Sequence, residues 1–413
     1  LILSITLLCG CTKIDNNNIE QIINKVISSK SNKANQYKNG YKFYLPSNLV
    51  IDKINERNIV FRENDLKYYM FVDIVSYYHK VENSYKVKEN TYMSKLINYD
   101  NKSGYIEINV KNKFNLWLEN AVDDSDLIAE LKSVADDENE VYERFYRELE
   151  FGTAGLRGII GAGTNRMNIY VVRRTTQGLA NFLKKKYGEA AVAISYDSRI
   201  KADYFAQEAA RVLAANGIKA YISRELQPTP VLSFLVRELK CKSGIMVTAS
   251  HNPAKYNGYK CYGEDGCQMT DVNAGTVYDE IQKVDIFNDV KLVDFEEGIK
   301  SGLIEWVDES VYETYLDNVQ AQTVNKDICK NAGLKVVYTP LNGAGNKLVR
   351  KILARIGVED ITVVPEQENP DGNFTTCPYP NPEIREALDL GLKLSEKVGA
   401  DLLLATDPDS DRV

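Results

Sequence analysis

Residues 244–253 read Gly-Ile-Met-Val-Thr-Ala-Ser-His-Asn-Pro. The apolar run 244–247 is typical of a short buried strand, and Pro253 bounds the polar loop that follows it. The loop carries Ser250 beside His251, so a hydroxyl and an imidazole are delivered at the end of a strand. We interpret this placement as suited to chemistry more than to packing.

Similar apolar runs precede this stretch at 192–196 and 218–222, and helical periods separate them. Short apolar strands that alternate with helices predict a mostly parallel sheet covered on both faces. Ligands bind at the carboxyl ends of the strands in such sheets, where Asp197-Ser198-Arg199 and the loop 248–253 would lie. We therefore predict an α/β/α domain over residues 111–308, which begins with acidic helices at 116–118 and over 126–149.

A second series of strands and helices follows a charged stretch. Strands are predicted at 335–338, 361–364 and 402–405. The glycines of 343–345 are interpreted as a turn that starts a helix, because the third glycine of a dinucleotide-binding fingerprint is absent. This series predicts a second mostly parallel α/β/α domain over 309–413. Because three strands make a thin core, we expect this domain to be incomplete and the natural protein to continue beyond Val413.

The first 110 residues differ in composition, being rich in Asn, Lys, Ile and Tyr. Aromatic and β-branched runs at 41–45, 59–61 and 68–75 predict strands, and a helix is expected over 19–28. We predict a small α+β or mostly β domain over 19–110, in which no residue pattern indicates a particular chemistry.

The extreme N-terminus has a pattern of its own. Residues 1–8 form an apolar run too short to span a bilayer, followed by Cys9-Gly10-Cys11 and a polar, Asn-rich segment. This is similar to the end of a bacterial lipoprotein signal, in which a small residue precedes the lipidated cysteine, here Cys11. We predict a partial signal and linker over 1–18 with membrane anchoring through Cys11. The alternative is a frayed apolar end of a soluble domain.

Composition excludes several classes of protein. With 44% hydrophobic and 26% charged residues in 413, the chain is an ordinary globular protein. The net charge of −7 and the lack of a long basic run argue against a nucleic-acid partner. Five of the seven cysteines lie in the second half without metal-ligand spacing, so we expect reduced thiols of a cytosolic protein.

Asp407, Asp409 and Asp411 alternate in a loop that leaves a predicted strand, so their carboxylates can converge on one point. Three hard oxygen donors at this spacing suit Mg²⁺. A calcium-binding EF-hand is excluded because Arg412 stands where that loop needs its glycine. A solvated acidic turn is the alternative, although carboxylates packed this tightly repel one another without a cation.

Ser250 and His251 lack the surroundings of a hydrolase triad. The nucleophile-elbow glycines are absent, and the one other histidine is the distant His79. Phosphoryl transfer instead relies on positioning, positive charge and a metal. Arg157 lies in a glycine-rich segment, 151–158, whose amides would suit a phosphate, although a tight turn explains these glycines as well. The candidate positive charges are Lys260, Arg157, Arg199 and Arg412.

Five motifs carry a resemblance to a known family. In chain order they are FGTAGLRG at 151–158, LQPTP at 226–230, TASHNPAKYNGYK at 248–260, NPDGNFTTCPYPNP at 369–382 and DPDSDR at 407–412. Together they resemble the α-D-phosphohexomutase family, in particular its bacterial phosphoglucomutase/phosphomannomutase branch, over 114–413. The resemblance implies an intramolecular phosphotransferase that interconverts hexose 1-phosphate and hexose 6-phosphate through a phosphoserine and a bisphosphate intermediate.

The resemblance also implies roles for individual residues. Ser250 would carry the phosphate, and a hexose 1,6-bisphosphate would be the activator. The implied catalytic residues are Ser250, His251, Lys260 and Arg157. The implied Mg²⁺ ligands are Asp407, Asp409, Asp411 and the phosphorylated Ser250. The implied phosphate-binding residues are Arg157, Arg199 and Arg412.

Two features depart from the family pattern. The family has four domains, and we expect its third and fourth, with their sugar-binding and phosphate-binding loops, to be needed for a closed site. Little or no activity is therefore expected of the chain as it stands. The segment before Lys111 has no counterpart in the family. The mutase part is expected in the cytoplasm, and the alternative is a membrane-anchored surface lipoprotein of unknown binding role.

Overall fold

The computed structural model describes short strands in the first hundred residues and almost everything after them. The described residues are 36–38, 41–43, 50–54, 58–63, 66–71, 91–99, 102–152, 155–325 and 327–413. They belong to two compact units, Leu1–Ile108 and Asn109–Val413.

The described part of the N-terminal unit consists of β-strands. These are β1 (Gln36–Lys38), β2 (Tyr41–Phe43), β3 (Val50–Ile54), β4 (Asn58–Glu63), β5 (Leu66–Phe71), β6 (Thr91–Tyr99) and β7 (Lys102–Asn109). Strands β1 and β2 pair antiparallel, β3, β4 and β5 form an antiparallel sheet, and β6 pairs with β7. The strands predicted at 41–45, 59–61 and 68–75 overlap β2, β4 and β5. The helix expected over 19–28 and the lipoprotein-like residues 1–18 lie outside the described residues.

Three helices open the second unit, namely α3 (Val110–Asn120), α4 (Ser125–Ser133) and α5 (Glu138–Phe145). The helical stretch predicted over 126–149 is divided in the structure, and its second part ends at Phe145. The division has a local cause: Asp124 and Asp137 each accept hydrogen bonds from the amides that follow them, so each starts a helix of its own.

A mixed sheet of six strands follows, in the order β13-β10-β9-β11-β12-β8. Strands β10 (Lys219–Ile222), β9 (Ala191–Tyr196) and β11 (Ser243–Val247) are parallel, as predicted, and β13 (Ile304–Trp306) extends this parallel set beside β10. Strand β12 (Tyr256–Gly263) is antiparallel to β11 and to β8 (Leu156–Ile159). Strands β8, β12 and β13 were not predicted. Residues 151–158 were interpreted as a loop because of their glycines, but Gly158 pairs with Asn257 inside the sheet.

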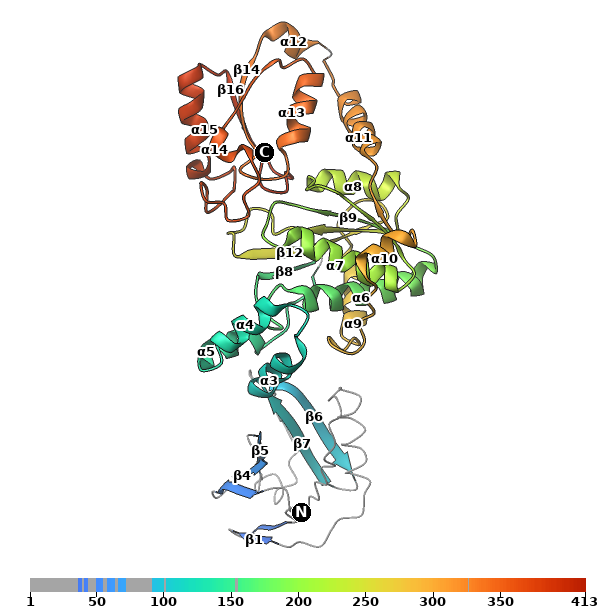
Figure 1. Ribbon diagram of the computed structural model, residues 1–413, viewed down its shortest axis with the longest axis vertical. Helices are drawn as coiled ribbons and strands as arrows, with labels where there is room; N and C mark the ends of the chain where they lie inside the picture. Colours follow the sequence, from blue (N-terminus) through green and yellow to red (C-terminus); the bar gives the residue numbers. More distant parts are fainter. Residues whose placement is uncertain are drawn as a thin grey trace. The chain divides into compact units, whose positions relative to one another are not determined.

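Helices cover both faces of this sheet (Figure 1). Alternate residues of a strand point to opposite faces and so join two different cores. Ile245 and Val247 join a core with α6 (Ile169–Tyr187), α7 (Ala202–Ala215) and α9 (Asp271–Ile281). Met246 joins the opposite core with α8 (Thr229–Glu238) and α11 (Glu309–Ala321). The short helix α10 (Phe295–Lys300) contacts α7. The predicted α/β/α layering is confirmed.

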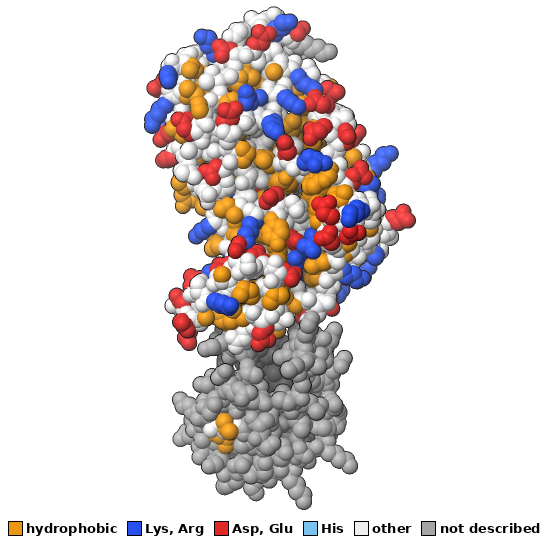
Figure 2. All heavy atoms as spheres, viewed as in Figure 1, with side chains coloured by type: hydrophobic (Ala, Val, Ile, Leu, Met, Phe, Trp, Pro, Cys, Tyr) orange, Lys and Arg blue, Asp and Glu red, His pale blue; other side chains and the backbone are white. Residues whose placement is uncertain are grey.

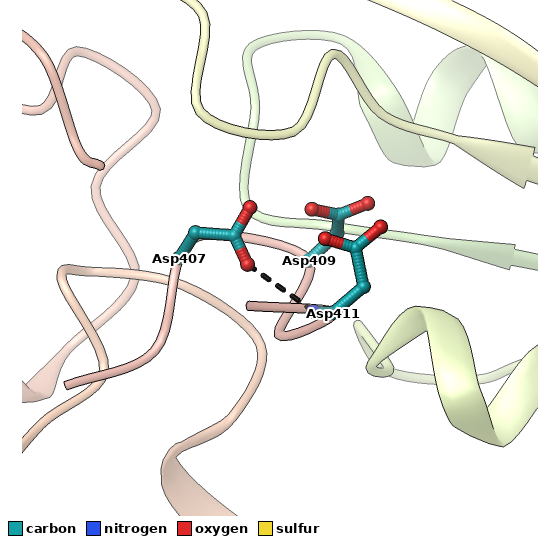
Figure 3. Close-up of side chains that lie close together, drawn as sticks. All are labelled: Asp407, Asp409 and Asp411. Carbon is teal, nitrogen blue, oxygen red and sulfur yellow. Dashed lines mark hydrogen bonds between the residues drawn. The ribbon is translucent and has the colours of Figure 1, made fainter. Parts of the chain in front are cut away.

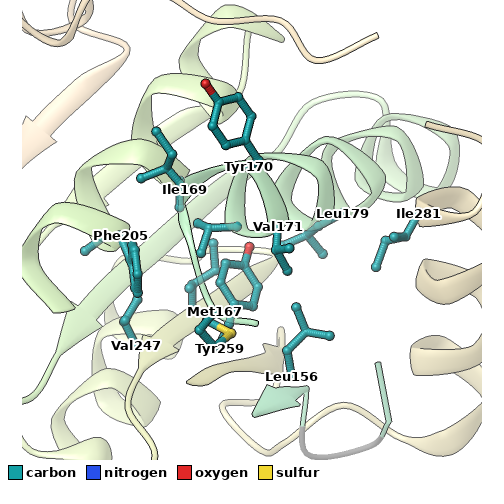
Figure 4. Packing of buried hydrophobic residues seen from close by; sticks show 14 of the residues in the cluster. Leu156, Met167, Ile169, Tyr170, Val171, Leu179, Phe205, Val247, Tyr259 and Ile281 are labelled. Carbon is teal, nitrogen blue, oxygen red and sulfur yellow. The ribbon is translucent and has the colours of Figure 1, made fainter. Parts of the chain in front are cut away.

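Tyr259 anchors β12 in the larger core (Figure 4). Its side chain is fully buried, and its hydroxyl lies 3.0 Å from Thr176 Oγ1 on α6, so the polar tip keeps a hydrogen-bond partner. Leu156 and Met167 pack into the same cluster. Burial of side chains of this size stabilises the fold by about 1.5–3 kcal/mol each. This anchoring holds β12 in place although the strand contains two glycines.

The second α/β domain has a parallel sheet in the order β15-β14-β16. Its strands are β15 (Asp360–Val363), β14 (Lys335–Thr339) and β16 (Leu402–Ala405), each within one residue of the prediction at both ends. Its helices are α12 (Ile328–Ala332), α13 (Asn346–Arg355), α14 (Pro365–Glu368) and α15 (Arg385–Val398). Helix α13 follows the glycines of 343–345 directly, which confirms their interpretation as a helix-start turn.

The face of the molecule shown in Figure 2 carries acidic and basic side chains interspersed over its described part. In the part of the chain that the structure describes, no helix combines the length and the apolar character that crossing a bilayer requires.

Candidate active site

The serine loop follows β11 and is shaped by buried hydrogen bonds. Thr248 Oγ1 donates to Asp197 Oδ2 at 2.6 Å and accepts from the Ser250 amide at 2.7 Å. Ser250 is only 4% exposed and has a φ of +54°, in the left-handed region that non-glycine residues seldom occupy. Such a conformation persists where its surroundings impose it. The loop is thus built to present one serine side chain.

Arg199 imposes much of this shape. Its side chain is fully buried, and its Nε lies 3.5 Å from Asp197 Oδ2. Its two terminal nitrogens donate to backbone carbonyls of the serine loop and of the start of β12. The acceptors are the carbonyls of Ser250 and Asn252, both at 2.5 Å, of Pro253 at 3.0 Å and of Tyr256 at 2.9 Å.

The phosphate-binding role predicted for Arg199 stays a prediction, and the contacts of its side chain are those of a residue that shapes the loop. Both terminal nitrogens of this fully buried guanidinium already donate to carbonyls, and its Nε, which has no hydrogen-bond partner among the described residues, lies 3.5 Å from Asp197 Oδ2 and away from solvent. The sequence showed a cation after a strand end, but it could not show that the side chain turns inward. Arg199 organises the loop that carries Ser250.

The three aspartates lie together after β16 (Figure 3). One carboxylate oxygen of each of Asp407, Asp409 and Asp411 lies within 4.8 Å of the others. Asp407 Oδ1 accepts from the amides of Asp411 and Arg412, both at 3.2 Å, so the loop curls around this side chain. The convergence predicted from the alternating spacing is present.

The serine loop and the aspartate loop meet although they belong to successive α/β domains. Ser250 Oγ donates to Asp407 Oδ2 at 2.9 Å, across 157 positions of sequence. His251 Nδ1 lies 3.1 Å from the same Oγ. While Ser250 gives its one hydrogen to Asp407, the His251 tautomer that completes this contact is the one that donates from Nδ1 and has Nε2 as its acceptor.

Lys260 reaches the same cluster from β12. Its Nζ lies 2.8 Å from Asp409 Oδ2 and 3.3 Å from Asp411 Oδ2, and the residue is 4% exposed. Burial alone would lower the pKa of Lys260, but the charge of Asp409 and its hydrogen bond outweigh burial and raise it. The ammonium is therefore held in its charged form.

The carboxylates differ in proton affinity. Burial, reinforced by the charges of Asp409 and Asp411, raises the pKa of Asp407 to about 8. Burial also opposes ionisation of Asp409, but the charge and hydrogen bond of Lys260 prevail and lower the pKa of Asp409. Lys260 thus holds Asp409 as an anion, whereas burial and the neighbouring carboxylate charges oppose the ionisation of Asp407.

These residues fit a divalent cation. Asp409 Oδ1 is buried and has no hydrogen-bond donor among the described residues. Three converging carboxylate oxygens match the preference of Mg²⁺ for hard oxygen ligands.

Two of the predicted cations lie at the rim of this cluster. Arg157 is exposed, and its Nη1 donates to Asn252 Oδ1 at 3.0 Å. Arg412 is partly exposed, and its Nη1 lies 2.8 Å from Glu383 Oε1. Burial lowers the pKa of His251, and the charges of Arg412 and Arg157 lower it further. Both guanidiniums remain accessible to an anionic ligand.

Sequence reasoning gave no role to two residues that hold the site. Asp197 was placed at the correct strand end but not connected with Thr248, whose hydroxyl it accepts. Thr229, in the LQPTP motif, donates its hydroxyl to Asp409 Oδ2 at 2.8 Å. The available signal for Thr229 was a polar residue between two prolines at a helix start.

The fold and the site together define a class: α/β proteins in which a buried serine at a strand end faces a carboxylate cluster from the next domain. Residues 148–286 match the family description "Phosphoglucomutase/phosphomannomutase, alpha/beta/alpha domain I", and residues 313–413 match the corresponding domain II. The chain belongs to the α-D-phosphohexomutase family.

Individual relatives agree with this assignment. The chain is 38% identical over 298 residues to a phosphoglucomutase of Staphylococcus saprophyticus, covering 72% of this chain and 53% of that protein. It is 37% identical over 294 residues to a phosphoribomutase of Saccharomyces cerevisiae, covering 67% and 47%. A solved phosphomannomutase-like structure from Thermus thermophilus superposes with a TM-score of 0.54 at 26% identity, covering 64% and 56%. The chain spans about half the length of the curated relatives it matches.

Proposed function

We propose that this protein contributes the phosphoserine and metal parts of a hexose-phosphate mutase site. Ser250 would carry a phosphoryl group, give it to a hexose 1-phosphate or 6-phosphate, and take back the other phosphate of the resulting bisphosphate. The hydrogen bond from Ser250 Oγ to Asp407 Oδ2, inside a cluster that also holds Lys260, is the observation that carries the proposal. Membership of the family supports it.

Asp407, Asp409 and Asp411 would hold Mg²⁺ together with the Ser250 phosphate. When bound, the ion would offset the negative charge on the transferring phosphoryl group. Lys260 adds a fixed positive charge from β12, and its two carboxylate contacts hold its ammonium toward the cluster. Asp407 Oδ2 accepts the hydrogen bond of Ser250 Oγ, so it would take the hydroxyl proton as Oγ bonds to phosphorus and the O–P bond of the bisphosphate breaks.

The remaining residues would bind and orient the substrate. Arg157 and Arg412 are accessible at the rim and would pair with phosphate oxygens. The lowered pKa of His251 favours a neutral ring near pH 7, with Nε2 open to accept a proton from a sugar hydroxyl. Because relatives include a phosphoribomutase as well as phosphoglucomutases, pentose phosphates belong among the substrates to be tested.

Phosphorylation of Ser250 by glucose 1,6-bisphosphate and Mg²⁺, followed by mass spectrometry of the tryptic peptide, tests the proposal without requiring full turnover. We expect one phosphoryl group on Ser250, none in Ser250→Ala, and unchanged labelling in Ser301→Ala, which alters an exposed serine. A coupled assay with glucose 1-phosphate and with ribose 1-phosphate measures turnover. Labelling that persists in Ser250→Ala would remove the assigned nucleophile.

Membrane anchoring through Cys11 is a separate proposal, supported by the Cys9-Gly10-Cys11 pattern after an apolar run. Growth with a labelled fatty acid, followed by isolation of the protein, tests it. Label is expected in the parent protein and not in Cys11→Ala, and an unlabelled parent would contradict the proposal.

A further inference from the structure

The N-terminus of α8 contacts the aspartate loop at two points. Thr229, the first residue of the helix, donates its backbone amide to the carbonyl of Asp409 at 2.7 Å. Its hydroxyl donates to Asp409 Oδ2 at 2.8 Å, across 180 positions of sequence. Thr229 is 6% exposed and Asp409 is fully buried. One residue of the first α/β domain therefore holds both the backbone and the side chain of a candidate metal ligand in the second.

The two oxygens of Asp409 consequently have different surroundings. Oδ2 accepts from Thr229 Oγ1 and from Lys260 Nζ, each at 2.8 Å. Oδ1 is buried and faces no donor among the described residues. A carboxylate fixed by two donors on one oxygen cannot rotate without breaking both bonds, so its other oxygen has a defined direction. Leaving Oδ1 without a partner is costly unless a cation occupies that direction.

Lys260 alone would not fix this orientation. Its ammonium ends a flexible side chain and is shared with Asp411 Oδ2 at 3.3 Å. The Thr229 hydroxyl is carried by a stiff, β-branched side chain at the start of a helix that packs into the core through Val231 and Leu232. Thr229 does not cap the helix, because the capping position is Pro228. The Thr229 hydroxyl therefore donates to the Asp409 carboxylate and not to the backbone of α8.

We propose that Thr229 is a positioning residue for the metal, which aims Asp409 Oδ1 at the cation while Lys260 neutralises Oδ2. This inference rests on the proposed function, since it takes the aspartate cluster to be the Mg²⁺ site. It gives the Pro-Thr-Pro sequence at 228–230 a chemical purpose beyond starting a helix. Groups that orient a metal ligand in this way typically contribute about 10–100-fold to affinity.

Titration of the protein with Mn²⁺ as a spectroscopic probe, read by electron paramagnetic resonance of the free ion, measures this contribution without any enzymatic activity. Thr229→Val keeps the shape and the backbone amide but loses the hydroxyl, and about 10–100-fold weaker Mn²⁺ binding is expected. Thr229→Ser retains the hydroxyl and should bind nearly as the parent does. Thr276→Val is the matched control, because Thr276 is exposed on α9 and donates only to the Val272 carbonyl.

The outcomes separate the inference from the proposed function. Unchanged Mn²⁺ affinity in Thr229→Val, with or without a lower melting temperature, would overturn the positioning role and leave the metal site intact. A parent protein that binds no Mn²⁺ would overturn the metal site itself. Thermal melting in EDTA shows whether each variant folds, and Thr229→Ala makes the same comparison if valine does not fit.

Discussion

The guanidinium carbon of Arg199 lies 5.0 Å from the centre of the Phe374 ring, so a loop of the second α/β domain covers the residue that shapes the serine loop of the first. The backbones of the two loops also approach closely at Gly372: an added Cβ there would lie 2.8 Å from the Ile200 amide nitrogen and 3.0 Å from the Ser198 carbonyl oxygen. The NPDGNF segment therefore closes over the turn that begins with Asp197.

Arg199→Lys should disable this arrangement while preserving the charge. A lysine ammonium cannot reproduce the planar set of donors that contacts four carbonyls. We expect a loss of about 2 kcal/mol or more in the free energy of unfolding, because buried carbonyls lose their donors. We also expect at least about tenfold slower labelling of Ser250 by glucose 1,6-bisphosphate, since a tenfold change needs only about 1.4 kcal/mol.

Arg237→Lys is the control for this substitution, because Arg237 is exposed and donates only a long bond, 3.3 Å, to the Ser233 carbonyl. Urea unfolding and peptide mass spectrometry provide the two measurements. Equal stability and labelling in Arg199→Lys and Arg237→Lys would show that the carbonyl contacts of Arg199 are dispensable.

Asp197 predicts a pH dependence of stability. Burial raises its pKa from 3.8 to about 6, against the lowering effect of Arg199. Because the folded-state pKa is the higher one, the group stabilises the fold below pH 3.8, and this contribution is lost as the pH rises through 6. The stability of Asp197→Asn relative to the parent should therefore improve by about 3 kcal/mol between pH 3.8 and pH 6 and then level off.

Urea unfolding of the parent and of Asp197→Asn at several pH values measures the difference in their free energies of unfolding. Any destabilisation caused by the Asn amide beside Thr248 is independent of pH and does not affect the trend. Asp308→Asn is a control of opposite sign. The hydroxyl and amide of Ser310 lower the pKa of the exposed Asp308 below 3.8, so the parent gains stability relative to Asp308→Asn as the pH rises toward 3.8, and this gain levels off above that pH. A relative stability of Asp197→Asn that stays flat from pH 3.8 to 6 would contradict the prediction.

Gly155 should tolerate no side chain. Its φ is +84°, and an added Cβ would lie 1.9 Å from the Tyr259 carbonyl oxygen. Gly155→Ala is expected to lose several kcal/mol, about 3 or more, because both backbone strain and a clash with β12 act together. Gly275→Ala, on the exposed face of α9 with no atom within 4 Å of its added Cβ, should be neutral or gain up to about 1 kcal/mol. Thermal melting of both variants makes the comparison, and similar melting temperatures would refute the clash.

Mg²⁺ should stabilise the folded chain, and EDTA should reverse the effect. A ligand at one hundred times its Kd stabilises by about 2.7 kcal/mol, which is a readily measured rise in melting temperature. Asp407→Asn should abolish this rise, because the cluster loses one of its three carboxylates. Asp317→Asn, at an exposed position on α11, should retain it. A rise of equal size in both variants would place the bound ion elsewhere.

Much of the fold could be predicted because most of its strands are short apolar runs separated by helical periods. β14, β15 and β16 were found almost to the residue. β8 and β12 were missed because glycines and polar side chains such as Lys260 obscure the apolar signal, and their place depends on tertiary packing around Tyr259. Sequence therefore located the parallel strands well, apart from the short β13, and the antiparallel edge poorly.

The site divides in the same way. The aspartate spacing predicted a metal loop, because residues at alternate positions lie close in any compact turn. The bond between Ser250 and Asp407 joins residues 157 positions apart, and no local pattern encodes it. The burial of the Arg199 side chain and the hydrogen bonds from Thr229 to Asp409 likewise depend on which loops pack together. Residue type indicated charge and chemistry, whereas burial decided whether a charge was free to bind a ligand.

The paired contacts of Thr229 with Asp409 have a consequence for how the protein can be studied. Because Thr229 at the start of α8 in one domain holds Asp409, a candidate metal ligand, in the other, we expect separation of the two domains to disorganise the aspartate cluster and to release an ion bound there. The amount of Mn²⁺ bound would then report on the contact between the two α/β domains. Substitutions far from the aspartates, for example in the loop around Phe374, could be ranked by how much they lower the affinity for Mn²⁺.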